Sequence, residues 1–381
     1  MSRDAASRGE SRVKTVAYDH QIFSAQRVGG VSRYFCEIAA RVSALPDWQS
    51  VVVAPVHFNE HLRSSTVRRL GCHIPMRVPR TGAFYRATNV VLAPLLLHAA
   101  SPAVVHRTYY SCWPRTRGAK VVVTVFDMIH EIFPQSFVSR DHTAVMKRRA
   151  VHEADAVICI SRTTAHDLQR LLDVPPEKIV ITHLGCAEAF APASTAAGGD
   201  AAAKRPYLLY VGHRAGYKNF ARLLNAYAAS ARLAQDFDLV VFGGAQFTGA
   251  EQALIESSIT GPGTVRRQTG SDSDLARAYA GARAMIYPSE YEGFGIPLLE
   301  AMSVGCPVIC SNASSIPEVA GEAGEYFDPR DSEAIRAAIE RVAYDDGRRQ
   351  ALIARGRARC LEFSWERCTA ETLALYRRLH P

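Results

Sequence analysis

Short apolar segments alternate with longer amphipathic segments along most of the chain. In the first half, apolar and β-branched runs predict strands at Val13–Tyr18, Val51–Pro55, Ala103–His106, Val121–Val125, Ala156–Ile160 and Ile179–Thr182. Helical periodicity predicts helices at Val31–Ser43, at Thr143–Glu153 and, with Ser161 as the N-cap, at Thr163–Leu172. Strands that alternate with helices are typical of a parallel, doubly wound sheet.

A second series of the same kind follows a stretch at 191–205 that is rich in small residues. It predicts strands at Tyr207–Val211, Leu239–Phe242, Val265–Gln268, Ala284–Tyr287 and Val308–Ile309. It predicts helices at Phe220–Arg232, Ala250–Ser257, Leu275–Ala280, Pro297–Val304, Ser332–Tyr344, Asp346–Cys360 and Glu366–Leu379.

Together, the two series predict an α/β protein with two Rossmann-like, doubly wound domains that face each other across a cleft. A chain of 381 residues with 48% hydrophobic residues is large enough for two cores. We expect a disordered tail at 1–12, an N-terminal domain at 13–190, a linker at 191–205 and a C-terminal domain at 206–365, with the last helix (about 366–381) folding back on the first domain. Ligands bind beyond the carboxyl ends of parallel strands, so the cleft is the expected site, and the linker would let it close.

The longest apolar run, Val90–Val105, has two interpretations. It contains Pro94, His98 and Pro102, and it is short for a helix that spans a membrane. It predicts either a buried helix that leads into a strand or a segment that re-enters a membrane.

The cellular compartment is indicated by the N-terminus and the cysteines. Residues 1–12 are polar and charged without an apolar core, which is not typical of a signal peptide. The 9 cysteines include no Cys-x-x-Cys pair. We therefore expect reduced thiols and a cytoplasmic protein.

Positive charge is concentrated in the first half of the chain. Between residues 51 and 150, 14 basic residues stand against 4 acidic ones. The main contributors are Arg68, Arg69, Arg77, Arg80, Arg86, Lys147, Arg148 and Arg149. An anionic partner is expected: a membrane surface, a lipid-linked phosphate acceptor or a nucleic acid, unless this is simply a solvated basic face.

Two of these partners can be separated further. No zinc-finger spacing and no aromatic–basic pattern of RNA-binding modules is present in the sequence, so we expect no nucleic-acid partner. For a membrane, we expect weak, salt-sensitive binding to anionic vesicles through residues 51–150, which would place the protein peripherally at the inner face of the membrane.

The segment from Glu292 to Glu300 carries the most specific chemistry. Strand Ala284–Tyr287 is followed by a turn that contains Gly293 and Gly295, and then by a helix that starts near Pro297. Glycines let the backbone approach a ligand, and the free amides of a helix start suit a phosphate or a sugar hydroxyl. Glu292 would meet a sugar, and Glu300, one turn into the helix, would accept the two hydroxyls of a ribose. The alternative is a turn residue and a solvated helix residue.

This segment resembles the corresponding motif of the retaining glycosyltransferases of GT-B architecture, in the large group 1 (family 4) class. The resemblance extends over Glu292–Ile309, Ser311–Gly321 and Tyr326–Pro329, and, before these, over Gln26–Tyr34 and Tyr210–Asn219. It implies transfer of a sugar from a nucleoside diphosphate sugar with retention of the anomeric configuration. It also implies that the N-terminal domain binds the acceptor and the C-terminal domain binds the donor.

The resemblance assigns roles to individual residues. Arg214 and Lys218 would hold the leaving diphosphate, because cations there stabilise the charge that grows as the glycosidic bond breaks. Gly29 and Gly30 would let the first domain approach the same phosphate, unless they serve only the turn. Arg33, one turn later, either assists at this phosphate or faces solvent, and of the two we expect it to face solvent. The donor site would be completed by Phe294, Gly295, Ile296, Leu299 and Glu300, with Glu292 as a catalytic residue.

The sequence departs from the family pattern at Phe126. Many members of the family have a histidine there, before an aspartate, near the reacting sugar. Asp127 is therefore our candidate for positioning or deprotonating the acceptor hydroxyl, and His130 is the second candidate. The alternatives are an aspartate that caps a turn and a structural histidine, and the donor phosphate itself could accept the proton.

No metal and no cofactor are expected. Asp272-Ser-Asp274 matches the metal-binding Asp-x-Asp of a different glycosyltransferase architecture, but it precedes a predicted helix and is interpreted as a loop and N-cap.

The predicted function is transfer of a sugar, with mannose as the guess, to a saccharide or lipid-linked acceptor in polysaccharide or lipopolysaccharide biosynthesis. The alternatives are a nucleotide-sugar epimerase or hydrolase of the same fold and a non-catalytic, membrane-associated assembly partner.

Overall fold

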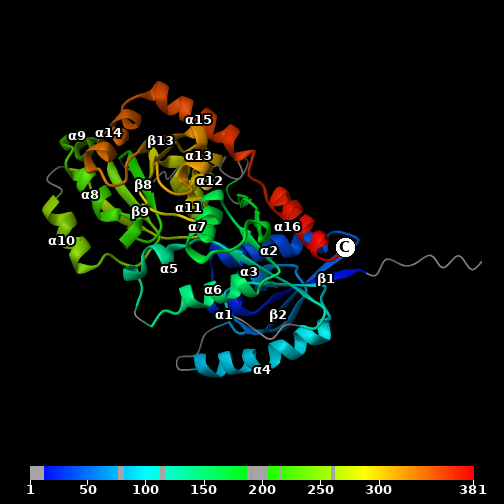
Figure 1. Cartoon of the computed structure of the whole chain (residues 1–381). Coiled ribbons are helices and arrows are strands. Elements are labelled where there is room, and N and C mark those ends of the chain that lie inside the picture. The colour runs from blue at the N-terminus through cyan, green and yellow to red at the C-terminus, as the bar shows by residue number, and fades with distance from the viewer. Residues whose placement is uncertain are drawn as a thin grey trace, which may run out of the picture.

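The computed structural model describes residues 13–75, 81–111, 116–138, 140–186, 190, 205–214, 216–258 and 262–381. In these ranges the chain forms two parallel β-sheets, each flanked by helices, that lie side by side (Figure 1). The tail expected at 1–12 and all of the expected linker except Arg205 lie outside the described residues.

The first sheet has seven strands in the order β3-β2-β1-β4-β5-β6-β7, and all neighbours are parallel. The strands are β1 (Lys14–Asp19), β2 (Trp48–His57), β3 (Arg69–His73), β4 (Val104–Arg107), β5 (Lys120–Val125), β6 (Ala156–Cys159) and β7 (Ile179–Ile181). Its helices are α1 (Gln21–Ala25), α2 (Gly30–Ser43), α3 (Glu60–Ser64), α4 (Gly82–Ala100), α5 (Ile129–Ile132), α6 (Thr143–Glu153) and α7 (Arg162–Leu172).

The second sheet has six parallel strands in the order β10-β9-β8-β11-β12-β13. The strands are β8 (Tyr207–Val211), β9 (Asp238–Phe242), β10 (Val265–Gln268), β11 (Ala284–Tyr287), β12 (Val308–Ser311) and β13 (Gly324–Phe327). Its helices are α8 (Phe220–Ala228), α9 (Ala231–Asp236), α10 (Gly249–Ser258), α11 (Asp272–Gly281), α12 (Ile296–Ser303), α13 (Ile316–Ala320), α14 (Ser332–Ala343) and α15 (Asp346–Cys360). In both sheets the strand order reverses beside the first strand, which is the doubly wound pattern that was predicted.

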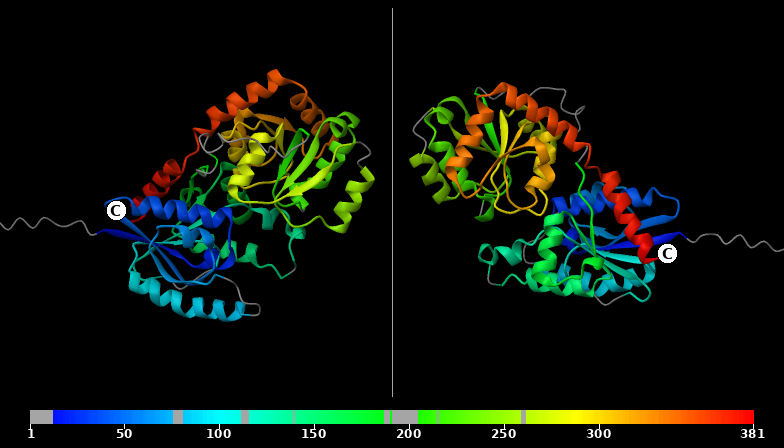
Figure 2. Two further views of the ribbon diagram at one scale, coloured as in Figure 1. Left: turned by 180° about the vertical axis from the view of Figure 1, so that it is seen from behind. Right: turned by 45° about the horizontal axis from the view of Figure 1, so that its top comes forward.

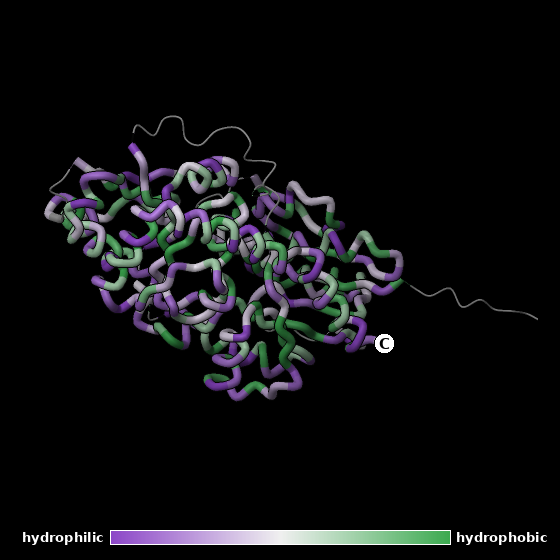
Figure 3. The backbone as a smooth tube through the Cα atoms, turned by 90° about the horizontal axis from the view of Figure 1, so that it is seen from above, coloured by the Kyte–Doolittle hydropathy of each residue, from purple (hydrophilic) through white to green (hydrophobic). Residues whose placement is uncertain are grey.

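Hydrophobic strands fill the interior of both halves, and hydrophilic segments lie mostly at the periphery (Figure 3). The sequence pattern did not predict two of the strands, β3 and β13. β3 is an edge strand with three exposed positions, and β13 alternates half-buried and buried residues, so neither forms a continuous apolar run. The single helix expected at Phe220–Arg232 is two helices, because the Ser230 side chain accepts from the Leu233 amide and starts α9.

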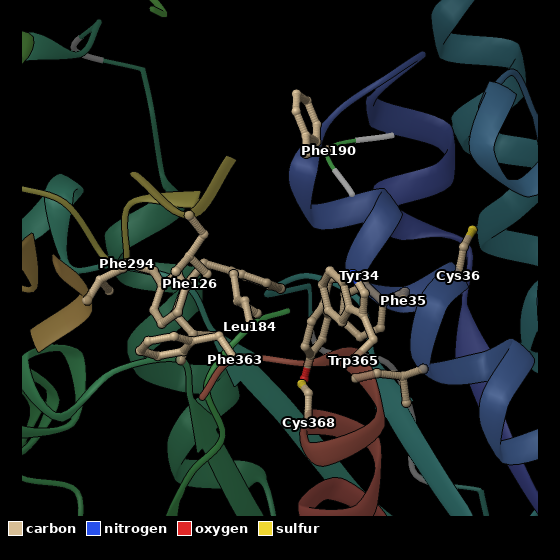
Figure 4. Packing of buried hydrophobic residues seen from close by; sticks show 14 of the residues in the cluster. Tyr34, Phe35, Cys36, Phe126, Leu184, Phe190, Phe294, Phe363, Trp365 and Cys368 are labelled. Carbon is tan, nitrogen blue, oxygen red and sulfur yellow. The ribbon is translucent and has the colours of Figure 1, made fainter. Parts of the chain in front are cut away.

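One of the hydrophobic clusters contains residues of both halves. The last helix, α16 (Trp365–Leu379), packs on α2 of the first half, where Arg41 also pairs with Glu366 (Figure 2). Around this junction, aromatic side chains from both halves meet, as Figure 4 shows. They include Tyr34, Phe126, Phe294, Phe363 and Trp365. The relative position of the two sheets is therefore fixed by buried apolar contacts as well as by covalent connections.

Helix α4 corrects one expectation. The apolar run from Val90 was expected to form a buried helix or a re-entrant segment, and it does form the second half of a helix that leads into β4. The helix is not buried, because Val91 and Leu95 are each 63% exposed. Only one of its faces packs on the first sheet, through Ala93 and Leu97.

Glu318 links the two halves at the start of α7. Its carboxylate, on α13 of the second half, accepts the backbone amides of Arg162 at 2.8 Å and 3.0 Å and of Thr163 at 3.3 Å. The ring of His183 lies 2.7 Å from the same carboxylate. Burial opposes ionisation, but the hydrogen bonds from His183 and the two amides outweigh it and lower the pKa of Glu318.

Replacing Glu318 with alanine should lower the free energy of unfolding at pH 7 by about 1–2 kcal/mol, because two helix-start amides lose their partner. Since the pKa of Glu318 is depressed in the fold, its contribution is present above the ordinary pKa of 4.5 and is lost as the pH falls through the folded value. Urea unfolding at pH 7 and at about pH 3.5 measures the difference. Glu371→Ala, in a surface pair with Arg367 on α16, is the control and should cost at most about 0.5 kcal/mol. An equal loss at both pH values for Glu318→Ala would contradict the assignment.

Candidate active site

A cavity of about 610 Å³ lies between the two halves, at the carboxyl ends of strands from both sheets. The first half contributes Gly29, Gly30 and Asp127 to its wall, and the second contributes Lys218, Glu292, Gly293, Phe294, Gly295, Ile296 and Glu300. The volume suits a small-molecule ligand of nucleotide size. Most of the residues selected from the sequence therefore come together around one cavity.

The turn after β11 is held rigidly against both halves. The hydroxyls of Ser314 and Ser315 donate to the carbonyl of Glu292 at 2.6 Å and 2.8 Å. Gly293 faces the first half, where a Cβ atom on this residue would lie 1.7 Å from the carbonyl oxygen of Phe126. Gly295 caps α12 with φ 106°, a conformation that favours glycine. Both glycines are therefore required by the backbone geometry of the site.

Glu292 forms an ion pair with Lys218 in the wall of the cavity. The ammonium of Lys218 lies 2.7 Å and 2.9 Å from the two carboxylate oxygens of Glu292. Glu292 is 7% exposed, so its charge is almost fully removed from bulk water and depends on this cation. The pair places one cation and one carboxylate side by side near the start of α12.

Glu300 lies one turn into α12 and is also buried. The hydroxyl of Tyr279 donates to its carboxylate at 3.2 Å. Burial raises the pKa of Glu300 to about 7, while nearby Arg33 favours the charged form and Asp272 opposes it. A buried carboxyl with a pKa near neutrality is typical of functional sites.

Arg33 is not the solvent-facing residue that was expected. It extends from α2 of the first half and forms an ion pair with Asp272 at the start of α11 in the second half. Its side chain is 18% exposed, and both partners line the cavity. The sequence could not indicate this pair, because 239 positions separate the two residues.

Asp127 and His130 have different surroundings. Asp127 follows β5 and lines the cavity; its carboxylate accepts the Ile129 amide at 3.0 Å and lies 3.9 Å from the buried ammonium of Lys147. His130 stacks on Phe137 at 3.9 Å between ring centroids, and its ring lies 3.5 Å from the carboxylate of Asp141. It is not among the residues that line the cavity.

Arg214 and Leu299 also lie away from the cavity wall. The Arg214 guanidinium pairs with Glu251 at 2.7 Å and packs over the ring of Phe247 at 4.8 Å. Leu299 is completely buried in the core. By contrast, His61, His213 and Tyr217 line the cavity and were not selected. His213 and Tyr217 lie within the Tyr210–Asn219 motif, next to Arg214 and Lys218, so their place in that motif was an available signal. His61 lies in α3 and belongs to no motif.

The segment Asp272-Ser-Asp274 forms the first turn of α11. Ser271 is the N-cap of α11, rather than Asp272, and it forms a capping box with Asp274. Asp274 also pairs with Arg277, whereas Asp272 pairs with Arg33. Within the described ranges, no group of three or more His, Cys, Asp or Glu side chains is arranged to hold a metal ion.

Two protein families match the chain, one for each half. Residues 28–189 match the family described as Glycosyltransferase Family 4, and residues 197–359 match the family described as Glycosyl transferases group 1. The chain is 35% identical to O-antigen chain mannosyltransferase B of Escherichia coli over 271 residues, which cover 68% of this chain and 70% of the relative. It is 29% identical to MMP alpha-(1->4)-mannosyltransferase of Mycolicibacterium hassiacum over 240 residues, which cover 61% and 56% of the two chains.

Solved structures resemble the whole described fold. WaaG, a glycosyltransferase involved in lipopolysaccharide biosynthesis, superimposes with a TM-score of 0.68 at 18% identity, over 95% of this chain and 99% of that chain. The sucrose-phosphate synthase of Thermosynechococcus elongatus gives a TM-score of 0.76 at 23% identity, over 96% and 99%. These likenesses confirm the predicted GT-B fold class.

The surroundings of Glu300 generate a prediction with opposite outcomes for two variants. Arg33→Ala removes the cation that favours the charged form, so the pKa of Glu300 should rise above about 7. Asp272→Asn removes a competing negative charge, so the pKa should fall. Carbon-13 NMR titration of carboxyl-labelled glutamate measures both, with the Glu300 signal identified by its loss in Glu300→Gln. Shifts in the same direction for the two variants would contradict this electrostatic account.

Proposed function

The chain belongs to the group 1 glycosyltransferases, and we propose that it transfers mannose from a nucleoside diphosphate sugar with retention of configuration and without a metal ion. The observation that carries the proposal is the pair of Lys218 and Glu292 beside the start of α12, in a cavity enclosed by both halves. Phosphate, sugar and ribose each find a chemically suitable group within this one space.

In the proposed donor complex, the diphosphate lies between Lys218, the first amides of α12 and the backbone at Gly29 and Gly30. Phe294, Gly295 and Ile296 form the backbone wall beside it. The ribose hydroxyls donate to Glu300 on the same helix. The sugar lies at Glu292, which is freed from Lys218 as the phosphate takes over this cation.

Arg214 and Leu299 have smaller roles in this proposal. Arg214 follows the same strand end as Lys218, and it joins the diphosphate only after its pair with Glu251 breaks. Leu299 supports α12 from the core rather than contacting the donor. Lys218 is therefore the main cation of the site.

During transfer, the bond between the anomeric carbon and the diphosphate oxygen breaks, and a bond to the acceptor oxygen forms on the same face of the sugar. The negative charge that develops on the leaving diphosphate is stabilised by Lys218 and the helix start. The acceptor proton passes to an oxygen of the leaving diphosphate. Asp127 accepts a hydrogen bond from the acceptor hydroxyl and orients it, while His130 remains a structural residue beside Asp141.

Mannose and the biosynthetic setting are inferred from the relatives. Two of them are named mannosyltransferases, one of these acting on an O-antigen chain, and the structural neighbour WaaG is named for lipopolysaccharide biosynthesis. We infer a cell-surface saccharide, free or linked to a lipid, as the acceptor. The epimerase, hydrolase and non-catalytic alternatives are not favoured, because these relatives are transferases.

The protein is proposed to act in the cytoplasm, at the surface of a membrane. Within the described residues, no helix combines the length and the apolar character that a membrane crossing requires.

The donor and the stereochemistry can be tested together. A thermal-shift panel of nucleotide sugars should give the largest stabilisation with a mannose donor, because a ligand that binds only the folded protein raises its midpoint. Proton NMR of the first product formed should show the α-anomer from an α-linked donor, with the same rate in excess EDTA. An inverted product, or a rate restored only by added metal, would overturn the corresponding part of the proposal.

Lys218→Ala and Glu292→Gln should each lower kcat about 10²- to 10³-fold, because each removes a charged group next to the reacting bond. Two controls carry the same substitutions elsewhere: Lys120→Ala, in a surface pair with Asp155, and Glu290→Gln, paired with Arg222. Both controls should keep kcat within about twofold. Steady nucleotide release at the wild-type rate in either active-site variant would refute the mechanism.

A further inference from the structure

Lys147 is a completely buried lysine to which the proposed mechanism assigns no role. The sequence counted it with Arg148 and Arg149 among the residues of a basic surface, but of the three only Arg148 and Arg149 are exposed. A lysine is almost never fully buried unless it is paired, because removing its ammonium from water costs free energy. The contacts of Lys147 therefore indicate what the buried charge does.

The ammonium of Lys147 connects two acidic residues. It donates to the carboxylate of Glu131, on α5, at 2.8 Å and to the backbone carbonyl of Asp127 at 2.8 Å. The carboxylate oxygen Oδ1 of Asp127 lies 3.9 Å from the same nitrogen, and the centroid of the Tyr110 ring lies 5.4 Å from it. Helices α5 and α6 pack together here (Figure 1), so that two carboxylates share one cation.

The two carboxylates differ in their access to the cavity. The side chain of Glu131 is 9% exposed, and its oxygen Oε1 is buried without a hydrogen-bond partner in the described part of the chain. The side chain of Asp127 is 30% exposed and lines the cavity. The buried pair with Glu131 therefore fixes the ammonium of Lys147, and the ammonium in turn contacts the residue that a ligand can reach.

Asp127 is held at its backbone as well as at its side chain. Its Oδ1 accepts the Ile129 amide at 3.0 Å, while Lys147 binds its carbonyl. A Cβ atom on Gly293, across the junction of the halves, would lie 2.9 Å from the Cβ of Asp127, so the backbone here has little room to move. Within the described residues, no hydrogen bond reaches Oδ2 of Asp127, which leaves this oxygen available to a ligand.

The other groups around Asp127 do not replace this cation. Four tyrosines lie close enough that the charge of Asp127, in addition to burial, raises the pKa of their hydroxyls, so they remain neutral. They are Tyr109, Tyr110, Tyr217 and Tyr291. Lys218, across the cavity, pairs with Glu292. Among the described residues, Lys147 is the one ion-pair partner of Asp127.

We propose that Lys147 is a positioning residue for the sugar transfer. It balances the charge of Asp127 and holds its backbone, so that Oδ2 points at the acceptor hydroxyl and accepts its hydrogen bond. Glu131 keeps the ammonium in this place. The inference rests on the proposed function, in which Asp127 orients the acceptor.

Lys147→Met removes the cation and keeps a side chain of similar length. It should lower kcat/KM for the acceptor saccharide about 10- to 100-fold, because the carboxylate that orients the acceptor is no longer held. The KM for the nucleotide sugar should change at most about twofold, since the donor groups lie on the other wall of the cavity. A purely structural role would lower the folded fraction, measured by circular dichroism, and affect both substrates alike.

A second variant covers the case in which Lys147→Met fails to fold because Glu131 is left buried without its cation. Lys147→Met/Glu131→Gln removes both charges, so no buried charge is left without its partner at these two positions, and it should show the same selective loss for the acceptor. Wild-type kcat/KM for the acceptor in either folded variant would overturn the inference.

A double-mutant cycle tests whether Lys147 acts through Asp127. Asp127→Asn alone should lower kcat/KM for the acceptor to a similar extent. Adding Lys147→Met/Glu131→Gln to it should lower kcat/KM by less than about threefold further, because the carboxylate that Lys147 supports is already gone. Losses that multiply would show that Lys147 acts independently of Asp127 and would contradict its role as a positioning residue.

Lys178→Met is the matched control. The ammonium of Lys178 donates to the carbonyls of Val151 and His152 near the end of α6, away from the cavity wall. This variant should keep kcat/KM for the acceptor within about twofold of wild type. A loss as large as that of Lys147→Met would mean that any disturbance of α6 impairs transfer, which would overturn the specific role of Lys147.

The same measurements separate this inference from the proposed function. Absence of transfer by wild type, or a wild-type kcat/KM in Asp127→Asn, would refute the proposed function or its acceptor step, and the role of Lys147 would fall with it. Impaired transfer by Asp127→Asn together with unimpaired transfer by the folded Lys147 variants would overturn the inference alone.

Discussion

The close approach of Gly293 to the end of β5 is the constraint on which the site depends. A Cβ atom at this position would lie 1.7 Å from the carbonyl oxygen of Phe126, so only glycine allows the two halves to meet at this distance. The hydroxyl of Thr164, in the first half, donates to the carbonyl of the same glycine at 3.2 Å and stabilises the contact. Because Glu292 and α12 flank Gly293 in the chain, this one contact brings both carboxylates of the second half opposite Asp127.

Helix α2 of the first half also connects the cavity wall with the core that the two halves share. Its first residue, Gly30, lines the cavity, and its buried face carries Tyr34 and Phe35 into the core that the two halves share (Figure 4). The ring of Phe126 packs edge-on against Tyr34 at 5.3 Å. Here the departure from the family pattern has a structural consequence. Phe126 belongs to the shared core and also lines the cavity, and Asp127 is the polar residue that follows it in the cavity wall.

The sequence predicts what is encoded locally and misses what depends on distant contacts. The parallel strands and the start of α12 follow from apolar runs, glycines and strand ends. The grouping of Lys218 with Glu292 was implied only by the family resemblance, and in the structure the two side chains form an ion pair. The pair of Arg33 and Asp272 has no local signal. Exposure of α4 has none either, because an apolar run looks the same whether a protein core or another surface covers it. Arg214 follows the right strand end, but its contact with Glu251 on α10 sets its direction.

The two buried carboxylates of the cavity are compensated in different ways, and this difference explains how the site would select a complete donor. The charge of Glu292 is balanced by Lys218, so an incoming diphosphate must compete for this cation. Glu300 accepts a hydrogen bond from Tyr279, and burial raises its pKa to about 7, so it gains most from a ligand that donates hydroxyls. A free sugar leaves the cation unused, and a lone phosphate leaves the buried carboxylate of Glu292 without its cation. In the proposed donor complex, diphosphate, sugar and ribose satisfy these groups together, so the site favours the intact nucleotide sugar over its fragments.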